Sequence, residues 1–320
     1  MLLGTWNLEN LYRPGGEFGP PDEASYEAKL AALASVVTDL APDVLGVQEV
    51  GEPEALDDLL RTVGGDWHVA LSAHPDSRGI RVGVISRTPL EVVADTHAFP
   101  PALRPVQVDD AGTTTAQSGR GFLAVRTEGR QREGLWLGVA HLKSKLLTYP
   151  GERFFPHDEG ERARYGAYAL YRRAAEAASL RALADELLAG DGRERDVAVV
   201  GDLNDEVQAA TTQIVLGPPG SEIGTHGYDH PDKGDAARLW DVAPLIPADR
   251  RYSRVNSGRR ELIDHVLVSH RLVRAVTAAG TGLPGDGGDG ALRLPSVGAD
   301  PGARRGEPGS DHAPVWIRVE

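Results

Sequence analysis

Short apolar runs alternate along this chain with longer segments of helical periodicity. Several runs are continuous rather than alternating, such as Val-Ala-Val-Val at 197–200, which is typical of strands buried on both faces of a sheet. The runs that predict strands are Leu2–Asn7, Val44–Glu49, Arg81–Arg87, Phe122–Thr127, Leu135–His141, Val197–Asp202, Leu262–Ser269 and Pro314–Val319.

Three segments between these runs carry apolar residues at helical spacing. The first predicts a helix over Tyr26–Leu40 that Pro42 ends, and the second predicts a helix over Pro53–Val63. The third and longest covers Glu161–Leu188, and the glycines that follow it end the helix. Strands that alternate with helices in this way indicate an α/β fold.

Two stretches show neither pattern, namely residues 103–119 and the Gly/Pro-rich residues 280–309. The second stretch leads back into the predicted strand Pro314–Val319, so we expect a long surface loop rather than a linker between domains. A chain of 320 residues lies within the range of one large α/β unit. The sequence therefore predicts a single catalytic domain over residues 1–320.

The composition excludes several kinds of chemistry. There is no cysteine, which excludes disulfides, zinc–thiolate sites and cysteine nucleophiles. The 47 acidic and 34 basic residues give a net charge of −13, so a non-specific electrostatic clamp on nucleic acid is not expected. The chain starts without a signal-peptide pattern, and no apolar run approaches the ~20 residues that cross a bilayer. We expect a cytoplasmic monomer that does not bind membranes.

Polar residues recur at the ends of six predicted strands. They are Asn7 and Glu9, Gln48 and Glu49, His141, Asp202 and Asn204, Asp264, and Asp311 with His312. One such residue is usually a turn former or a helix cap, but a set of six strand ends indicates an active site of a layered α/β protein. Carboxylate and amide oxygens suit Mg²⁺ or Mn²⁺, and histidine beside a carboxylate serves as an acid, a base or a donor to phosphate.

In this order, the motifs resemble those of the endonuclease/exonuclease/phosphatase superfamily, which includes DNase I-like nucleases, abasic-site endonucleases, sphingomyelinases, deadenylases and inositol polyphosphate phosphatases. The matching motifs are Trp6-Asn7-x-Glu9-Asn10, Gln48-Glu49, His141-Leu142-Lys143-Ser144, Gly201-Asp202-Leu203-Asn204, Ile263-Asp264-His265 and Ser310-Asp311-His312-x-Pro314. The resemblance implies a four-layer α/β sandwich, in which helices flank two packed and mainly antiparallel sheets, with the site at one rim.

The resemblance also implies a bound Mg²⁺ or Mn²⁺ ion. Glu49 would be the principal ligand, and Asn7 and Glu9 would assist it. Asp311 would bind or position the metal. Whether one or two ions act stays open.

The other motif residues receive catalytic roles from the resemblance. Asp202 would orient or deprotonate the attacking water, and Asn204 would hold that carboxylate and a phosphate oxygen. His141 and His312 would donate to the non-bridging phosphate oxygens, where charge accumulates in the transition state. Asp264 would pair with His312 and favour its charged form. No covalent intermediate is needed.

Cationic and aromatic residues near these motifs are candidate substrate contacts. Lys143 and Lys145 are two of only four lysines and directly follow His141, although a solvated loop explains them equally well. Arg120 is a weaker candidate of the same kind. Phe154 and Tyr168 belong to a segment, 149–173, that is rich in aromatic residues and arginine. This segment either stacks on bases or forms the buried start of the long helix.

Three further histidines have simpler explanations. We expect His265 to have a structural or indirect role. His226 and His230 lie near Asp229 and Asp232, where a second metal site is conceivable but a polar loop is the preferred interpretation.

The leading hypothesis is metal-dependent hydrolysis of phosphodiester bonds, by in-line attack of a water that Asp202 orients, in a DNA or RNA nuclease. One alternative is a phosphatase or phosphodiesterase acting on a small phosphorylated molecule, such as a nucleotide or inositol phosphate. Another is a catalytically inactive binding module on the same scaffold. The aromatic segment and the lysine pair favour the polymer, whereas the net charge favours the small substrate.

Overall fold

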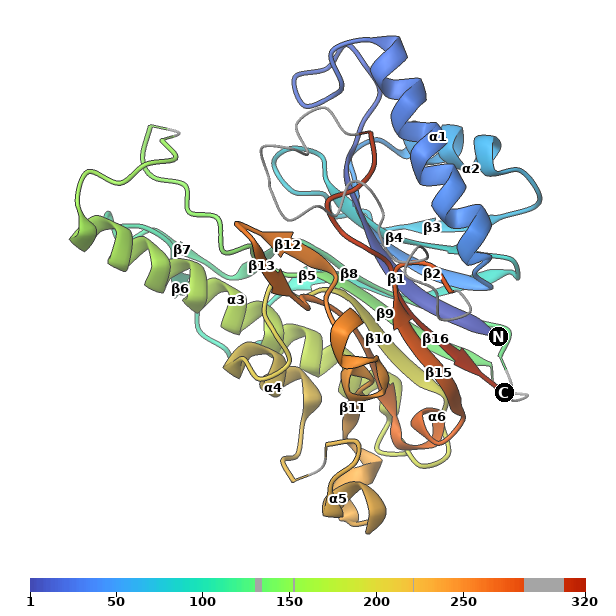
Figure 1. The fold of residues 1–320 in the computed structure, drawn as a ribbon. Coiled ribbons are helices and arrows are strands. Elements are labelled where there is room, and N and C mark those ends of the chain that lie inside the picture. The colour runs from blue at the N-terminus through green and yellow to red at the C-terminus, as the bar shows by residue number, and fades with distance from the viewer. Residues whose placement is uncertain (130–133, 152, 221, 285–307) are drawn as a thin grey trace.

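The computed structural model describes residues 1–129, 134–151, 153–220, 222–284 and 308–320. Its centre consists of two six-stranded sheets packed face to face, with helices on both outer faces (Figure 1). The layers therefore follow the order helix, sheet, sheet, helix, which confirms the predicted four-layer α/β sandwich.

The first sheet contains β1 (Leu2–Leu11), β2 (Val44–Val50), β3 (His68–Leu71), β4 (Arg81–Ser86), β15 (Val276–Thr281) and β16 (Val315–Val319). Its strand order is β15-β16-β1-β2-β4-β3. β1 and β2 are parallel, and the other neighbouring pairs are antiparallel. The two ends of the chain meet in this sheet, where the ammonium group of Met1 donates to the carbonyl of Val319 at 2.9 Å (Figure 1).

The second sheet contains β5 (Leu90–Ala98), β8 (Gln117–Thr127), β9 (Leu135–His141), β10 (Val197–Asp202), β11 (Leu239–Asp241) and β14 (Asp264–Ser269). Its order is β11-β14-β10-β9-β8-β5, and again only the central pair, β9 and β10, is parallel. Two small hairpins stand apart from the sheets, β6 (Val106–Gln107) with β7 (Thr114–Thr115) and β12 (Arg254–Asn256) with β13 (Arg259–Glu261).

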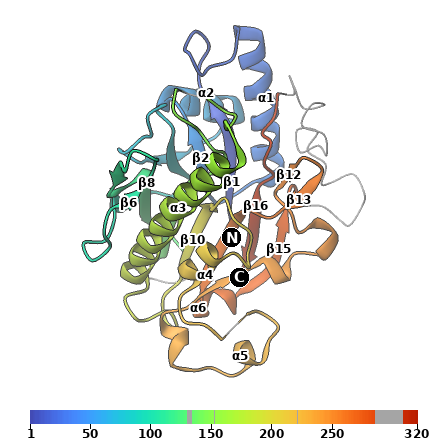
Figure 2. The ribbon, with the colours of Figure 1, turned by 90° about the vertical axis from the view of Figure 1, so that its left-hand side faces the viewer.

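The long helices cover the outer faces of the sheets. α1 (Glu23–Leu40) and α2 (Pro53–Val63) pack on the first sheet, and α3 (Glu159–Leu188) with α4 (Ala210–Leu216) packs on the second (Figure 2). Asp22 and Asp158 cap the starts of α1 and α3 by accepting from backbone N–H groups. The short elements are α5 (His226–Asp229), α6 (His270–Val273), η1 (Lys233–Ala236), η2 (Ala243–Leu245) and η3 (Ala248–Arg250). Among the described residues, no helix has the length and apolar character of a membrane span.

Side chains alternate between two cores along each central strand. In β10, Ala198 and Val200 point into the core between the sheets, whereas Val197 and Val199 point toward α3. This burial on both faces explains the continuous apolar runs of the sequence. The sheets approach closely at Gly46, where an added Cβ would lie 2.6 Å from a methyl carbon of Val200.

The structure extends several predicted elements and adds others. β9, β10 and α2 have the predicted bounds. The stretch 103–119 is not wholly irregular, since it holds the β6–β7 hairpin and the start of β8. Within the predicted loop 280–309, Gly280 belongs to β15 instead, and residues 285–307 lie outside the described part of the chain. The prediction of a single domain stays a prediction.

Candidate active site

The strand register brings four of the predicted polar residues to one edge between the sheets. Asp202 lies two residues after Val200 and therefore points to the same side, toward the first sheet. The neighbouring strands place His141 and Asp264 directly opposite Asp202. Asn7 reaches across from the first sheet, and its Nδ2 donates to Asp202 Oδ2 at 3.1 Å. All four side chains are buried.

Irregular backbone places two further residues at this edge. Glu49 has a φ of 60° where the pairing of β2 shifts register, an uncommon conformation for a residue with a side chain. Its carboxylate accepts from Asn7 Nδ2 at 3.3 Å and from the backbone N–H of Asn10 at 2.8 Å. Glu9 has a φ of 50°, outside the extended region, although it lies within β1. Glu9 accepts from the backbone N–H of Asp311 at 2.8 Å.

Asp202 is the centre of the cluster. Its Oδ1 accepts from the backbone N–H of Asn204 at 2.9 Å. Its Oδ2 lies 3.4 Å from His141 Nε2 and 3.9 Å from His312 Nε2. Burial and the negative charge of Asp264 raise the pKa of Asp202 to about 6, although the positive charge of His312 opposes them. Such a carboxylate is a proton acceptor suited to near-neutral pH.

His312 forms a buried ion pair with Asp264, in which Nδ1 and Oδ2 are 2.6 Å apart. Burial disfavours the charged imidazole, but the Asp264 carboxylate outweighs it and raises the pKa of His312 to about 9. His312 is therefore a cation at neutral pH. Its other ring nitrogen faces Asp202 and Asp311, the latter at 3.7 Å.

His141 has the opposite protonation. Burial, and then the charges of Arg120 and His312, hold the pKa of His141 well below its ordinary value. Its Nε2 faces the carboxylates of Asp202 and Glu49, at 3.4 and 4.0 Å, so the proton of the neutral ring belongs on that nitrogen. Its Nδ1 is buried and has no hydrogen-bond partner among the described residues, in keeping with an unprotonated nitrogen.

The C-terminal motif is fixed to β1 by hydrogen bonds. Ser310 Oγ donates to the carbonyl of Asn7 at 2.6 Å, and Trp6 Nε1 donates to the carbonyl of His312 at 2.8 Å. Arg254 of β12 donates to Asp311 Oδ2 at 3.1 Å. The sequence did not single out Arg254, because it lies 57 residues before its partner and belongs to no motif.

Two sets of side chains carry donor atoms of the kind that bind a divalent cation, but only the first is clustered among the described residues. The first has ligand atoms within 4.8 Å of one another and consists of Asp202, Asp264 and His312. The second is the set that the resemblance implied, Asn7, Glu9, Glu49 and Asp311. The carboxylate and amide oxygens of both sets are the hard donors that Mg²⁺ and Mn²⁺ prefer, so these residues fit such an ion, whereas His312 in its charged form has no lone pair to offer. In the second group the carboxylate of Glu49 is partly exposed, whereas that of Asp311 is engaged by Arg254.

The predicted cationic contacts differ in their surroundings. Lys143 is half-buried and its Nζ donates to the carbonyl of Leu146 at 2.9 Å. Burial and then the charge of Arg172 lower the pKa of Lys143 to about 8. Lys145 Nζ lies 3.3 Å from Asp205 Oδ1. Arg120 pairs with Asp76 at 3.2 Å and lies near enough to His141 to affect its pKa.

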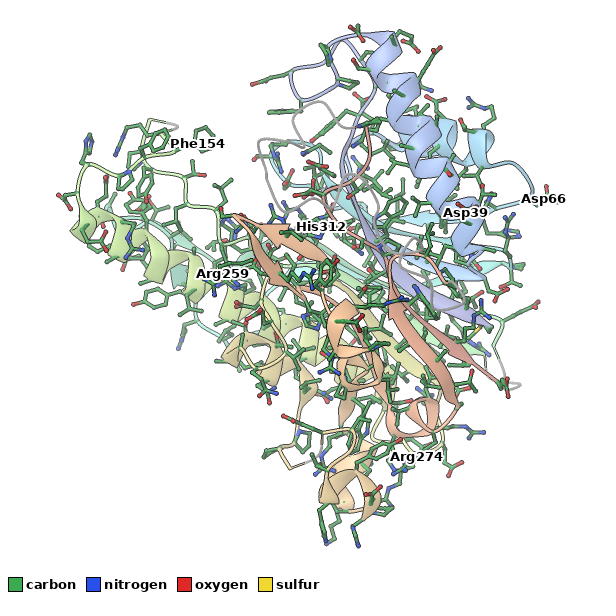
Figure 3. All side chains as sticks on the ribbon, in the orientation of Figure 1. Asp39, Asp66, Phe154, Arg259, Arg274 and His312 are labelled. Carbon is green, nitrogen blue, oxygen red and sulfur yellow. The ribbon has the colours of Figure 1, made fainter. Side chains whose placement is uncertain are left out.

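The aromatic segment divides into packed and exposed rings. Tyr168 packs edge-on between the rings of Tyr165 and Tyr171, and its hydroxyl donates to Asp110 at 2.9 Å. This packing favours a structural role for Tyr168. Phe154 is 63% exposed, on the loop between β9 and α3 that projects from the body of the molecule (Figure 3). It remains a candidate substrate contact.

The other histidines lie away from the cluster. The rings of His226 and His230 stack with their centroids 3.9 Å apart, and Asp232 caps η1 and binds Arg238. Within the described ranges, the candidate metal-binding group is Asp202, Asp264 and His312, which supports the preferred interpretation of a polar loop. His265 points to the outer face of β14, where Asp241 holds it at 2.8 Å.

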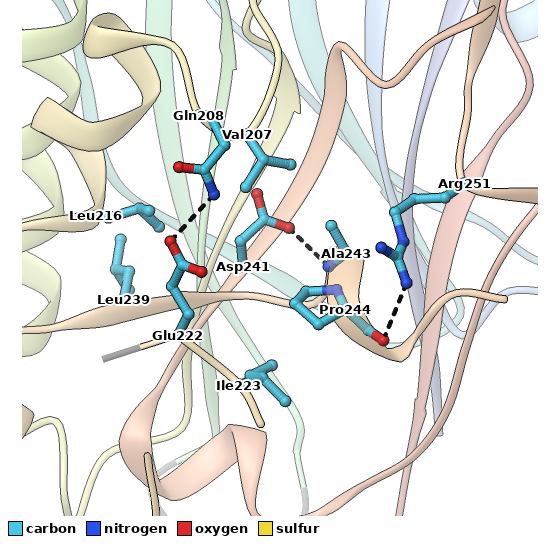
Figure 4. A pocket seen from close by; sticks show the side chains of 10 residues that line it. All are labelled: Val207, Gln208, Leu216, Glu222, Ile223, Leu239, Asp241, Ala243, Pro244 and Arg251. Atoms are coloured by element: carbon cyan, nitrogen blue, oxygen red, sulfur yellow. Dashed lines mark hydrogen bonds between the residues drawn. The ribbon is translucent and has the colours of Figure 1, made fainter. Parts of the chain in front are cut away.

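A cavity of about 270 Å³ contains none of the candidate site residues (Figure 4). Apolar side chains form most of its wall, with polar groups from Gln208, Glu222, Asp241 and Arg251. Asp241, which lines the cavity, is the partner of His265 on the outer face of β14.

Comparisons with known proteins identify the family and the fold. A model of the Endonuclease/Exonuclease/phosphatase family matches residues 4–312. No curated protein matches the sequence at a significant level.

Three of the solved structures that share the fold are similar to this chain over nearly its whole length. The mannosyl-6-phosphatase of Bacteroides thetaiotaomicron is 14% identical, with a TM-score of 0.56 and coverage of 100% of this chain and 99% of that chain. The 3'-5' exonuclease of Neisseria meningitidis is 15% identical, with a TM-score of 0.55 and full coverage, 100%, of both chains. The human Nocturnin catalytic domain is 15% identical, with a TM-score of 0.52 and coverage of 99% and 93%.

Proposed function

The chain belongs to the endonuclease/exonuclease/phosphatase family of phosphoric ester hydrolases, and we propose that it is a divalent-metal-dependent phosphodiesterase that acts on DNA or RNA. The observation that carries the proposal is the buried carboxylate of Asp202, which lies between a neutral histidine, His141, and a cationic one, His312. A proton acceptor, a cationic donor and a neutral donor then surround one point, and each is suited to near-neutral pH.

Glu49 and Asn7 would hold the metal ion, beside Asp202 and opposite His141. When bound, a divalent cation neutralises the charge of the phosphate and polarises its P–O bonds. Asp311 and Glu9 contribute indirectly, because Glu9 fixes the backbone of Asp311 and Arg254 engages its side chain.

Asp202 accepts a proton from the attacking water, which forms the new P–O bond while the bond to the leaving oxygen breaks. Asn7 Nδ2 and the backbone N–H of Asn204 hold the two carboxylate oxygens and aim them at the water. The imidazolium of His312 and the Nε2–H of His141 donate to the phosphate oxygens, where negative charge grows. Asp264 keeps His312 charged and oriented.

The exposed Phe154, and Phe155 beside it at 82% exposure, support a nucleic-acid substrate because unpaired bases stack on such rings. The Neisseria relative has also been solved as a 3' phosphatase bound to a product DNA hairpin. A second candidate is a small phosphorylated molecule. The net charge of −13, and the likeness in fold to a mannosyl-6-phosphatase, favour it.

A substrate panel tests both candidates. The purified protein is assayed with Mg²⁺, Mn²⁺ or EDTA against plasmid DNA, single-stranded DNA, RNA, a small bis-phosphodiester and phosphomonoesters. We expect cleavage of a nucleic acid that EDTA abolishes. Turnover of phosphomonoesters alone would support the second candidate, and no turnover of any ester would refute both.

The variant Asp202→Asn tests the catalytic assignment. It removes the proton acceptor while keeping the size and the acceptor oxygen of the side chain. We expect kcat to fall by about 100- to 10,000-fold with an unchanged thermal midpoint. A folded variant with a rate near that of the wild type would show that Asp202 is not the acceptor.

A further inference from the structure

Two buried side chains of α3 form hydrogen bonds with the backbone of Lys143, two residues after His141. Glu176 Oε2 accepts from the N–H of Lys143 at 2.5 Å, and Arg173 Nη1 donates to the carbonyl of the same residue at 3.1 Å. Glu176 and Arg173 are both buried. The segment that leaves β9 is thus fixed through both backbone polar groups of one residue, Lys143.

The same Arg173 connects this segment to the turn after β10. Its Nε donates to Asp205 Oδ2 at 2.7 Å, and Thr211 Oγ1 of α4 donates to the same oxygen at 2.7 Å. Lys145 Nζ lies 3.3 Å from the other oxygen of Asp205. One buried carboxylate therefore joins both loops that carry catalytic residues to two helices of the outer layer.

His265 contacts the backbone of Asp205 from the outer face of β14. Its Nε2 is 2.8 Å from the carbonyl of Asp205, and its Nδ1 is 2.8 Å from Asp241 Oδ2. Both partners are acceptors only, so both ring nitrogens must carry a proton.

We propose that Asp205 and His265 are positioning residues, which fix the turn that carries Asn204 and align it with the segment that carries His141. This inference rests on the proposed function. Asn204 sits in that turn with a φ of 55°, a conformation that its surroundings must hold in place. On the active-site side, Asn204 Nδ2 donates to the carbonyl of Leu142 at 3.0 Å, and the N–H of Leu142 donates to the carbonyl of Asp202 at 3.0 Å. On the side away from the active site, the contacts of Asp205 with Arg173 and of His265 with the Asp205 carbonyl hold the same turn.

Loss of this restraint lowers turnover rather than substrate binding, since neither side chain touches the reacting atoms. We expect Asp205→Asn to lower kcat by about 10- to 100-fold, because a displacement near 1 Å has that effect on positioned groups. KM should change less than about threefold.

Asp235→Asn is the matched control. Asp235 is likewise a buried carboxylate, and it contacts the buried Arg238 at 2.6 Å, but it lies in η1 outside the site. We expect the two variants to lose similar stability, with kcat reduced only in Asp205→Asn. Equal kcat values in both variants would overturn the inference.

Two measurements test His265 separately. Proton NMR of the wild type should show a slowly exchanging imidazole N–H signal that is lost in His265→Ala, as the hydrogen bond from His265 Nε2 to the Asp205 carbonyl requires, and its absence would refute the positioning role of His265 whatever the enzyme hydrolyses. His265→Ala should lower kcat at least about tenfold, and added imidazole should restore part of it by occupying the vacated space next to the cavity that Asp241 lines (Figure 4).

Each outcome has a distinct meaning. If the wild type shows no turnover, the proposed function is refuted. The NMR result then decides whether His265 holds the turn that carries Asn204. If His265→Ala does not fold, Asp205→Asn and the NMR measurement still decide the inference. A folded His265→Ala variant with the wild-type kcat overturns it.

Discussion

The ion pair of Asp264 and His312 allows a quantitative prediction. Asp264 raises the pKa of His312 to about 9, against an ordinary value of 6.5. At pH 7.5 a group with that pKa is about 97% protonated. In Asp264→Asn the burial remains but the carboxylate charge is gone, so the pKa of His312 should fall below its ordinary value. The charged fraction at pH 7.5 is then below about 10%.

We therefore expect Asp264→Asn to lower kcat/KM at pH 7.5 at least about tenfold, for a loss of electrostatic support of about 3 kcal/mol. The assay is the pH dependence of kcat/KM. The wild type should show a bell, with an acidic limb near 6 from Asp202 and an alkaline limb near 9 from His312.

In the variant the alkaline limb should move to lower pH, because the charge of Asp264 raises the pKa of His312. Asp235→Asn, remote from the site, should keep both limbs in place. An alkaline limb that stays near 9 in Asp264→Asn would mean that His312 does not owe its charge to this carboxylate.

Two other predictions concern the substrate and the packing of the sheets. Phe154→Ala should raise KM for a nucleic acid about 5- to 100-fold, from the loss of one stacked ring, and leave KM for a small diester unchanged. Leu170→Ala, an exposed apolar change on α3, is its control, and equal effects on both substrates would contradict base stacking. Gly46→Ala should lower the free energy of unfolding by about 1–3 kcal/mol in urea titrations, because its Cβ would lie 2.6 Å from Val200. Gly16→Ala, where nothing lies within 4 Å, should be neutral, and equal stability of the two variants would show that the sheets separate easily.

Much of the secondary structure was predictable from local patterns. Strands buried on both faces, such as β9 and β10, appear in the sequence as continuous apolar runs that end at a polar residue. β5 was missed because it is an edge strand whose residues are largely half-exposed, which leaves no apolar run. β15 was missed because its Val-Thr-Ala-Ala-Gly-Thr sequence has few large apolar side chains.

The sequence by itself determined which residue types stand at the ends of the central strands, and those motifs identify the family. The tertiary structure decided how they meet. Asn7 and Asp202 are 195 residues apart and belong to different sheets, so only the packing of the sheets brings them to 3.1 Å. Glu49 takes its left-handed conformation where the pairing of β2 shifts register, and Arg173 meets Asp205 because α3 packs on the outer face of the second sheet. Local patterns record burial and periodicity, whereas these contacts arise from long-range packing that no short segment encodes.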